Sequence, residues 1–243
     1  MKPSLFDTVY GDESSKLRRL LRKGVDVNER SPEGTTPLYL AAWNPEKTRL
    51  LLKAGADPNA ESPEGTPLCF AASWGITDSV DALLEHGAHP DGIEDADCAP
   101  ITPLVWATGH GHEDVARLLL ERGADPNLAP RAGWTPLMAA ALRGSISLVE
   151  ILLEHGADSR VADAHGQTAL EVAEEWADRD VEAELRRELE STADEGERIT
   201  VKRTPQPDGT ELVELELRRP NGGGSGRSLQ TGHSQIAELL RTR

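Results

Sequence analysis

The chain has few of the residues on which a large aromatic core or a metal site depends. Only 4% of its 243 residues are aromatic, and its two cysteines are Cys69 and Cys98. Two cysteines cannot make a zinc ribbon or a disulfide framework, and free thiols are typical of a reducing cytoplasm. Low aromatic content is expected where small residues let two helices pack closely.

Long apolar segments are also missing. No run of about 18 apolar residues occurs, and a membrane-spanning helix needs about that length. Residues 1–16 contain no apolar stretch of the kind found in a signal peptide. We therefore expect a cytoplasmic protein, with neither a membrane span nor secretion by a standard signal peptide.

Motifs of catalytic and nucleotide-binding sites are absent as well. GxSxG, GxxxxGK[ST], GxGxxG and HExxH do not occur, and the glycine-rich stretch 222–226 lacks the flanking strand and helix of a phosphate loop. His86 and His155 fall in the same position of two related segments, and repetition in register indicates a structural role. The remaining histidines include His89, His165 and His233, which have no partner at the spacing of metal ligands. We expect no catalysis, no bound metal and no cofactor.

A repeating unit is the main feature that the sequence does have. A threonine opens each unit, followed by Pro-Leu or, in the last unit, by Ala-Leu, at Thr36, Thr66, Thr102, Thr135 and Thr168. The spacings between these threonines are 30, 36, 33 and 33 residues. A closing signature recurs too, for example LLKAGADPN at 51–59 and LLERGADPN at 119–127. Paired motifs at a fixed period indicate a solenoid of stacked units.

The opening motif has a physical reading. Threonine is a favourable N-cap, and proline fits the first helical position because its missing N–H would be unpaired there. A second helix then ends at a glycine, which permits the left-handed turn after a helix. The closing glycines are Gly55, Gly87, Gly123 and Gly156.

Over roughly residues 4–190 the chain resembles the ankyrin repeat family. The resemblance implies an all-α repeat solenoid, in which helix-turn-helix units are joined by β-turn fingers. We assign an N-terminal capping repeat, four full repeats and a degenerate C-terminal repeat to residues 1–30, 31–61, 62–94, 95–129, 130–162 and 163–190. Arg outnumbers Lys about threefold, which suggests a GC-rich bacterial genome.

The C-terminal part departs from the repeat. Residues 169–190 are expected to form one long, charged amphipathic helix that caps the array. Apolar and polar residues alternate over 213–218, which predicts a β-hairpin within 191–220. A flexible glycine-rich linker at 221–227 and a terminal helix at 228–243 follow. Two alternatives remain for that helix: it completes the final repeat, in which the hairpin is then an insertion, or it is a loose tail.

Net charge is −16, and the excess lies in the array. Residues 191–243 contain eight acids and eight Lys or Arg, so the rest of the chain holds 34 acids against 18 bases. An acidic surface repels phosphate backbones and anionic membranes, so we expect neither as a partner. The excess either keeps an elongated surface soluble or suits a basic partner protein.

Family members usually bind partners on the concave face, which the finger tips and the first helices form. On that pattern four of the five tryptophans fall at exposed contact positions, whereas Trp106 falls where a core leucine is usual. Tryptophan is common among interface hot spots. The predicted partner-binding residues are Trp43, Trp74, Trp134, Trp176, Tyr39, Leu142 and Arg143, together with the finger acids Glu33, Glu61, Glu64, Glu94, Asp95 and Asp97.

The function that follows is a non-catalytic interaction module, a monomer that holds a partner protein on its concave face. An alternative is a dedicated inhibitor that occludes the active site of one enzyme. An enzyme with its site in the last 50 residues is disfavoured, because that segment has one histidine and no cysteine.

Overall fold

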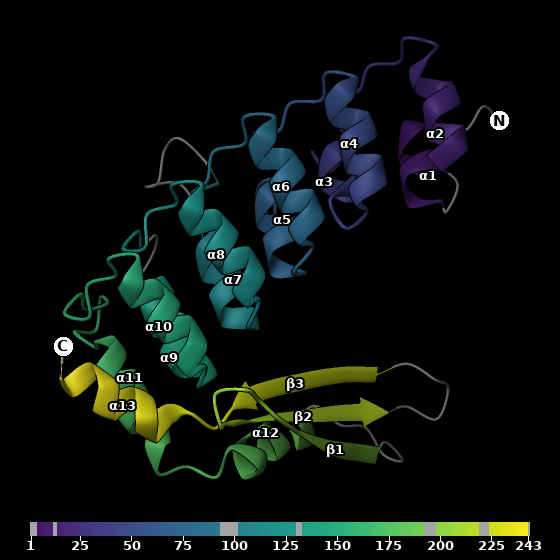
Figure 1. Cartoon of the computed structure of the whole chain (residues 1–243). Coiled ribbons are helices and arrows are strands. Elements are labelled where there is room, and N and C mark those ends of the chain that lie inside the picture. Colours follow the sequence, from purple (N-terminus) through teal and green to yellow (C-terminus); the bar gives the residue numbers. More distant parts are fainter. Residues whose placement is uncertain are drawn as a thin grey trace. The chain divides into compact units, whose positions relative to one another are not determined.

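The computed structural model describes residues 4–11, 14–92, 102–129, 133–191, 198–218 and 224–242. The chain divides into two compact units, Met1–Pro136 and Leu137–Arg243. Figure 1 labels the helices and strands.

The Met1–Pro136 unit consists of stacked helix pairs. The pairs are α1 (Leu5–Tyr10) with α2 (Ser14–Leu21), α3 (Pro37–Ala41) with α4 (Pro45–Lys53), α5 (Pro67–Ser73) with α6 (Thr77–Glu85), and α7 (Pro103–His110) with α8 (Glu113–Glu121). The first helices pack on one another in the order α1, α3, α5, α7, and the second helices in the order α2, α4, α6, α8. Each pair therefore packs mainly on its neighbours, as expected of a repeat solenoid.

Threonine and proline start the first helices as the sequence predicts. The Thr36, Thr66 and Thr102 hydroxyls each accept a hydrogen bond from the backbone N–H three residues later, at 3.2, 3.3 and 3.2 Å. All three threonines are buried, and a proline occupies the first turn of each helix. The cap therefore satisfies a buried donor that no helical bond reaches.

Asparagine side chains connect the fingers of successive repeats. Asn28 Nδ2 donates to the Gly55 carbonyl at 3.2 Å, and Asn59 Nδ2 donates to the Gly87 carbonyl at 2.9 Å. Each Oδ1 also accepts the backbone N–H two residues beyond that glycine, at 2.9 and 2.8 Å. One amide thus makes both bonds to the next repeat.

Asp91 occupies the same position one repeat later. Its Oδ1 accepts the Asp125 N–H at 2.9 Å, but a carboxylate has no proton with which to donate the second bond. Partial burial raises the pKa of Asp91 above its usual value, and this effect outweighs the Asp125 hydrogen bond. The ionised side chain is therefore less well accommodated than an amide would be.

The Leu137–Arg243 unit combines helices with a small sheet. Its helices are α9 (Pro136–Arg143), α10 (Ile146–Glu154), α11 (Ala169–Ala177), α12 (Val181–Glu190) and α13 (His233–Arg241). The strands β1 (Arg198–Pro205), β2 (Glu211–Arg218) and β3 (Gly224–Gln230) form an antiparallel sheet in the order β1-β2-β3. One face of the sheet packs on α12, through the buried residues Val181, Leu185, Leu189, Val213, Leu215 and Leu217.

The predicted C-terminal elements differ from the structure in three ways. Residues 169–190 form two helices, not one, because the Asp180 carboxylate accepts the Ala183 N–H at 3.2 Å and starts α12 as a new helix. Residues 224–227, predicted as part of a flexible linker, form the beginning of β3, so the predicted hairpin is a three-stranded sheet. The terminal helix is correspondingly shorter than predicted and spans His233–Arg241.

The terminal helix completes the final repeat. Helix α13 packs on α11 and α10, and His233 Nε2 hydrogen-bonds the Leu142 carbonyl at 3.0 Å. In the other unit His112, next to the start of α8, bonds the Ser73 carbonyl in the same way, also at 3.0 Å. Of the two alternatives, the structure therefore shows the docked helix, with residues 178–232 inserted between the two helices of one repeat.

The docked helix requires a glycine at position 144. Gly144 has φ +75°, its carbonyl accepts the Gly232 N–H at 3.0 Å, and a Cβ there would collide with the Gln230 carbonyl and the His233 ring. Only glycine combines this left-handed conformation with such a close approach.

We predict that Asp91→Asn raises the free energy of unfolding at pH 7 by about 0.5–1 kcal/mol, because the amide restores the missing bond at a partly exposed site. The pKa of Asp91 is raised in the folded state, so ionisation of this carboxyl lowers the stability of the wild type as pH rises above about 4. The stabilisation by Asp91→Asn should therefore be smaller near pH 4 than at pH 7. Urea denaturation followed by tryptophan fluorescence measures this effect. The matched control, Asn59→Asp, should lower stability, and equal stabilities for wild type and Asp91→Asn would contradict the prediction.

A second prediction concerns the pH dependence of α13. Burial lowers the pKa of His233 below 6.5, so the folded state binds fewer protons than the unfolded state, and docking weakens as pH falls below about 6.5. Hydrogen exchange of the α11 and α13 amides, corrected for intrinsic rates, should show faster opening at pH 5 than at pH 7. His233→Gln keeps a neutral donor and should lose most of this dependence. An unchanged pH response in that variant would assign the effect to other groups.

Candidate protein-binding surface

Aromatic side chains run across two neighbouring first helices of the Met1–Pro136 unit. The ring centroids of Tyr39 on α3 and Phe70 on α5 are 4.9 Å apart, and those of Phe70 and Trp74 are 6.2 Å apart. Trp74, at the C-terminal end of α5, is 64% exposed, whereas Tyr39 is buried. Tyr39 thus supports a run of rings that ends at an open indole.

The next first helix, α7, continues the aromatic surface. Trp106 and Phe70 each lie four residues after their capping threonine, and α5 packs on α7. The ring centroids of Trp106 and His110 are 5.3 Å apart, and His110 stacks on His112 at 6.0 Å with an interplanar angle of 7°. We call the set Tyr39, Phe70, Trp74, Trp106 and His110 the aromatic strip.

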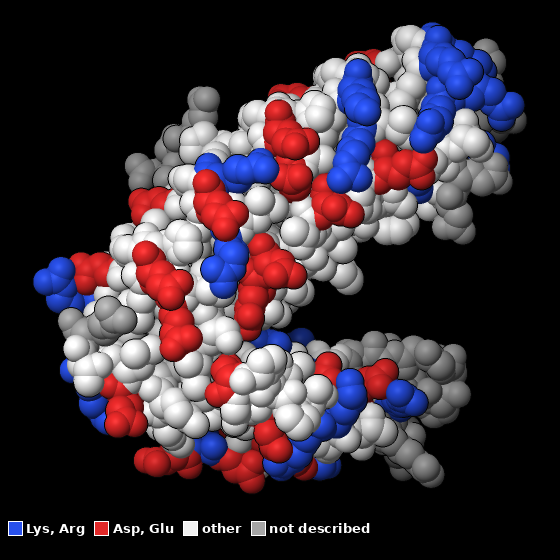
Figure 2. Space-filling view, viewed as in Figure 1, with Lys and Arg blue, Asp and Glu red and all other residues white. Residues whose placement is uncertain are grey.

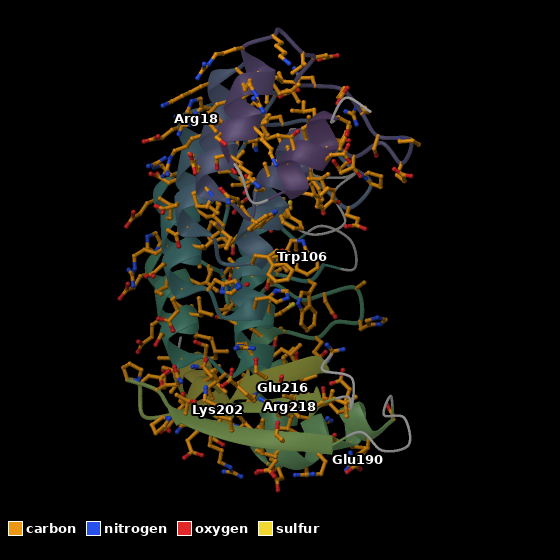
Figure 3. The ribbon with its side chains drawn as sticks, turned by 90° about the vertical axis from the view of Figure 1, so that its right-hand side faces the viewer. Arg18, Trp106, Glu190, Lys202, Glu216 and Arg218 are labelled. Carbon is orange, nitrogen blue, oxygen red and sulfur yellow. The ribbon has the colours of Figure 1, made fainter. Side chains whose placement is uncertain are left out.

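The structure corrects the prediction for Trp106. The sequence pattern puts this residue in the core, but the ring is only partly buried. The same position is held by Leu40 and Phe70 in the two preceding repeats, where it is also partly exposed. In the two following repeats it is held by Ala139 and Val172, which are buried, so the position borders the surface only in the preceding part of the array. Figure 3 shows Trp106 on the side of the repeats opposite to Arg18 of α2. Phe70 and His110 were likewise not predicted, although their offset from the opening threonine could have indicated them.

Tyr39 is fixed by a finger acid. Its hydroxyl donates to Glu64 Oε2 at 3.1 Å. Burial, followed by the Glu64 carboxylate, raises the pKa of Tyr39 well above its ordinary value. Glu64 is therefore a partner of the strip and not a free finger charge.

Trp43 covers a buried lysine. Lys47 is fully buried, and its ammonium donates to the Val9 carbonyl at 2.8 Å and to the Gly11 carbonyl, both at the C-terminal end of α1. The ammonium also lies 5.3 Å from the ring centroid of Trp43, which is 41% exposed. A cation is stabilised both by helix C-terminal carbonyls and by an indole face. Trp43 thus contributes to attaching α1 to α4, whatever else it contacts.

The remaining predicted residues of this unit lie outside the strip. Trp134 is partly buried just before Thr135, and Glu33 and Glu61 are exposed on fingers. A hydrogen bond from Ser31 lowers the pKa of Glu33. Glu94, Asp95 and Asp97 lie outside the described residues.

Three predicted partner-binding residues of the Leu137–Arg243 unit, Leu142, Arg143 and Trp176, contact the C-terminal part of the same chain. Arg143 Nη1 donates to the Ser228 carbonyl at 2.7 Å and to its Oγ at 3.1 Å. The Leu142 carbonyl accepts from His233, and the Trp176 ring lies 5.7 Å from the His233 ring. These contacts join residues far apart in the sequence, so the repeat pattern could not reveal them.

These contacts leave the charged guanidinium of Arg143 in a partly unfavourable environment. Burial lowers the pKa of its guanidinium, Glu214 partly opposes that effect, and its Nε is buried without a partner among the described residues. The role of Arg143 is therefore to hold β3 beside α9, at the cost of incomplete hydrogen bonding.

Charged residues cover the second helices instead. Figure 2 shows Lys and Arg over α2 and α4, acids over α6, and charges of both signs over α8. Several ions are paired across neighbouring repeats, including Arg18–Glu46 at 2.8 Å and Arg122–Asp81 at 2.5 Å. Exposed pairs of this kind add little stability. The two sides of the repeats thus differ: one is charged, and the other carries the aromatic strip.

No alternative site of other chemistry emerges from the described residues. Across the ranges given above, no three His, Cys, Asp or Glu side chains are placed to hold a metal ion. In the same ranges no helix is long and apolar enough to cross a membrane. His86 and His155 each hydrogen-bond the carbonyl four residues earlier, both at 2.8 Å, which is the structural role that their repetition predicts.

Comparisons with known proteins agree with this architecture. A family model described as ankyrin repeats (3 copies) matches residues 5–94 and 44–130. A second, described as ankyrin repeats (many copies), matches residues 119–173. The comparison with curated proteins finds no match.

The geometry predicts that two tryptophans differ in their effect on stability. Trp43→Ala should lower the free energy of unfolding by about 1–2 kcal/mol, because the Lys47 ammonium loses its indole partner and apolar area is exposed. Trp74→Ala should change it by less than about 0.5 kcal/mol, because most of that ring already contacts solvent. Urea denaturation of the two variants tests the difference, and a larger loss for Trp74→Ala would reverse the assignment.

Proposed function

Because the chain belongs to the ankyrin repeat family, whose repeats are generally protein–protein interaction modules, we propose that it binds a partner protein on the aromatic strip and has no catalysis of its own. The site lies on the first-helix face of the Met1–Pro136 unit, which corresponds to the concave face of the family.

The exposed indole of Trp74, beside Phe70, is the observation that carries the proposal. Its exposed fraction of 64% is unusual for so large an apolar side chain. Tryptophan is the residue most enriched at hot spots, and such anchors are effective when the surrounding surface excludes water. Phe70, Trp106 and His110 supply that surrounding surface.

Rigidity supports the same role. The first helices α3, α5 and α7 are capped at their first turns. Helices α3 and α5 pack on the first helices on both sides, and α7 packs on α5. A binding surface built on such helices loses little conformational entropy when a partner docks. The strip is therefore preorganised for binding.

The chemistry of the strip suggests a partner with apolar anchors and basic residues. Lys47 lies over the Trp43 ring, so an indole of this unit already accommodates a cation. An Arg or Lys of the partner would be attracted to the open face of Trp74 in the same way. The exposed acids Glu33 and Glu61 on the fingers would raise the association rate of a basic partner. We propose a monomer acting in the cytoplasm on such a partner.

This surface is narrower than the one that the sequence predicts. Leu142, Arg143 and Trp176 contact β3 and α13, so we leave them out of the proposed site. Tyr39, the buried member of the strip, supports the Phe70 ring. Trp43 covers Lys47 and is left out of the proposed site, and Trp134 is left unassigned.

We predict that Trp74→Ala weakens binding of a captured partner by about 2 kcal/mol, or roughly 30-fold in Kd. The partner is first captured from host lysate by the wild-type chain and then titrated by calorimetry. Adding Trp106→Ala should weaken binding further, with folding of each variant confirmed by circular dichroism.

The matched control is Arg117→Ala, an exposed residue of α8 on the charged side, which should leave Kd unchanged. If the partner binds the Trp74 variant as tightly as the wild type, the aromatic strip is not the site. If Arg117→Ala alone abolishes binding, the site lies on the second helices.

A further inference from the structure

Strand β1 forms an open edge of the inserted sheet. It pairs with β2 over its full length, from Arg198↔Arg218 to Pro205↔Glu211. Among the residues that the structure describes, no other strand pairs with it, and it is an end strand of the sheet in Figure 1. Unpaired edges are sites at which another strand can add.

The alternation of hydrogen bonds between β1 and β2 identifies which backbone groups of β1 point away from the sheet. Gln206 donates to the Thr210 carbonyl at 2.9 Å in the turn between β1 and β2, and antiparallel strands exchange hydrogen bonds at every second pair. The bonded pairs are therefore Thr204↔Leu212, Lys202↔Glu214 and Thr200↔Glu216. The N–H and C=O groups of Ile199, Val201 and Arg203 then point away from the sheet.

A contact of β3 independently supports this assignment of the bonded pairs. Arg143 binds the Ser228 carbonyl of β3, which must therefore point away from β2. Ser228 pairs with Glu214, so the backbone groups of Glu214 point toward β1, in agreement with the bonded pair Lys202↔Glu214. The outward groups of β1 accordingly repeat every second residue, at the spacing that an added strand needs.

The side chains of β1 also leave part of the sheet uncovered. Helix α12 packs on β2 and β3, where Leu215 and Leu217 are each 1% exposed, whereas Val201 is 36% exposed. An added strand could therefore extend the apolar layer of this face over Val201.

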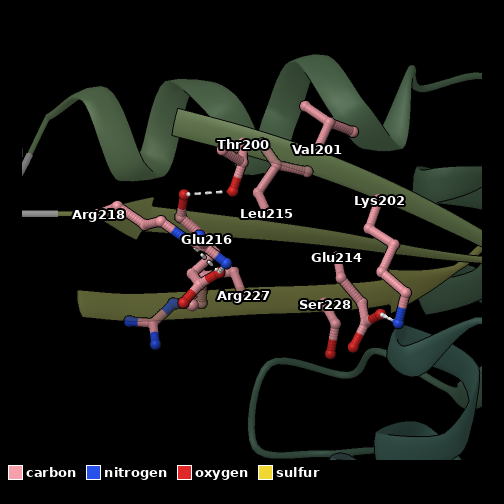
Figure 4. Close-up of a pocket in the computed structure, with 10 residues that line it drawn as sticks. Thr200, Val201, Lys202, Glu214, Leu215, Glu216, Arg218, Arg227 and Ser228 are labelled. Atoms are coloured by element: carbon pink, nitrogen blue, oxygen red, sulfur yellow. Dashed lines mark hydrogen bonds and ion pairs between the residues drawn. The ribbon is translucent and has the colours of Figure 1, made fainter. Parts of the chain in front are cut away.

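The opposite face is polar. A shallow depression of about 560 Å³ is lined by Thr200, Lys202, Glu214, Glu216, Arg218 and Ser228, among others. Figure 4 shows these side chains. The Lys202 ammonium, whose side chain is 74% exposed, is 3.0 Å from Glu214. It can approach a second carboxylate on its open side.

We propose that the β1 edge is a strand-addition site that takes an extended segment of another protein in which apolar residues alternate with Asp or Glu. The apolar residues would cover Val201, and the acids would pair with Lys202. This site is separate from the aromatic strip and does not depend on it.

A second copy of the chain is a poorer occupant. Pairing β1 with itself would bring the cations Lys202 and Arg203 of both copies onto adjacent strands, and like charges across strands are destabilising. Lysine and proline on an edge, here Lys202 and Pro205, are typical devices against self-pairing. Glu182 and Glu211 already pair with Arg203, and Glu214 already pairs with Lys202. An acidic segment would add a second carboxylate on the exposed side of the Lys202 ammonium, which β1 of a second copy, having no acid, would not supply.

A peptide with the β2 sequence, ELVELELR, is a suitable probe, because it has the required alternation and its parent strand already pairs with β1. Binding of the labelled peptide to the full-length chain is measured by fluorescence anisotropy at 0.15 M salt. We expect Val201→Pro to weaken binding at least tenfold, because proline removes an outward N–H yet leaves the bonds to β2 intact. We expect the same peptide with its glutamates changed to lysine to bind at least tenfold more weakly.

The control variant is Val201→Thr, which keeps the amide and should bind within about twofold of the wild type; circular dichroism confirms folding of both variants. Equal binding to the wild type and Val201→Pro would overturn the proposal, as it would show that the peptide displaces β2 or binds elsewhere. Equal binding of the lysine peptide would overturn the acidic specificity. Sedimentation velocity of the unliganded chain completes the test: a dimer that Val201→Pro abolishes would assign the edge to a second copy instead.

Discussion

The capping bond from a threonine hydroxyl fixes where α3, α5 and α7 begin in the Met1–Pro136 unit, and the aromatic strip depends on it. Successive residues of an α-helix are rotated by about 100°, so a start shifted by one residue would turn each ring to a different direction. Because Thr66 and Thr102 accept equivalent bonds, Phe70 and Trp106 occupy equivalent positions on adjacent helices. The exposed strip is thus a consequence of a repeated buried hydroxyl.

Much of the fold could be predicted from the sequence, because its determinants are local. The Thr-Pro-Leu openings, the closing glycines and the alternation around Leu215 each specify an element through neighbouring residues. The boundary between α11 and α12 was missed because Asp180 could either continue a charged helix or cap a new one, and only packing of α12 on the sheet decides between them. The third strand was missed because Gly and Ser have low strand propensity on their own; pairing with β2 overrides that preference.

The candidate site was harder to predict than the fold. Trp74 stands eight residues after its opening threonine, at a position that the repeat pattern predicts to be exposed, and its exposed fraction is 64%. Arg143 and Trp176 hold the same position in later repeats but are only partly exposed. Trp106 was misjudged because a position bordering the core can be buried or open, depending on the size of its neighbours. Arg143 and Trp176 were misjudged for a different reason: their partners, Ser228 and His233, are more than 50 residues away in the chain, and no periodic pattern encodes such contacts.

The division of the last repeat between α11 and α13 has a consequence for biosynthesis. Ribosomes add about 5–20 residues per second, so roughly 3–10 s separate the emergence of α11 from that of its packing partner. During this time the α11 surface that Ile236, Ala237 and Leu240 will cover has no cover from α13. The sheet and α12 can form meanwhile, since their contacts are local to the insertion. The order of folding would then be inverted relative to the order of the sequence: the inserted segment folds first, and the repeat that surrounds it closes last.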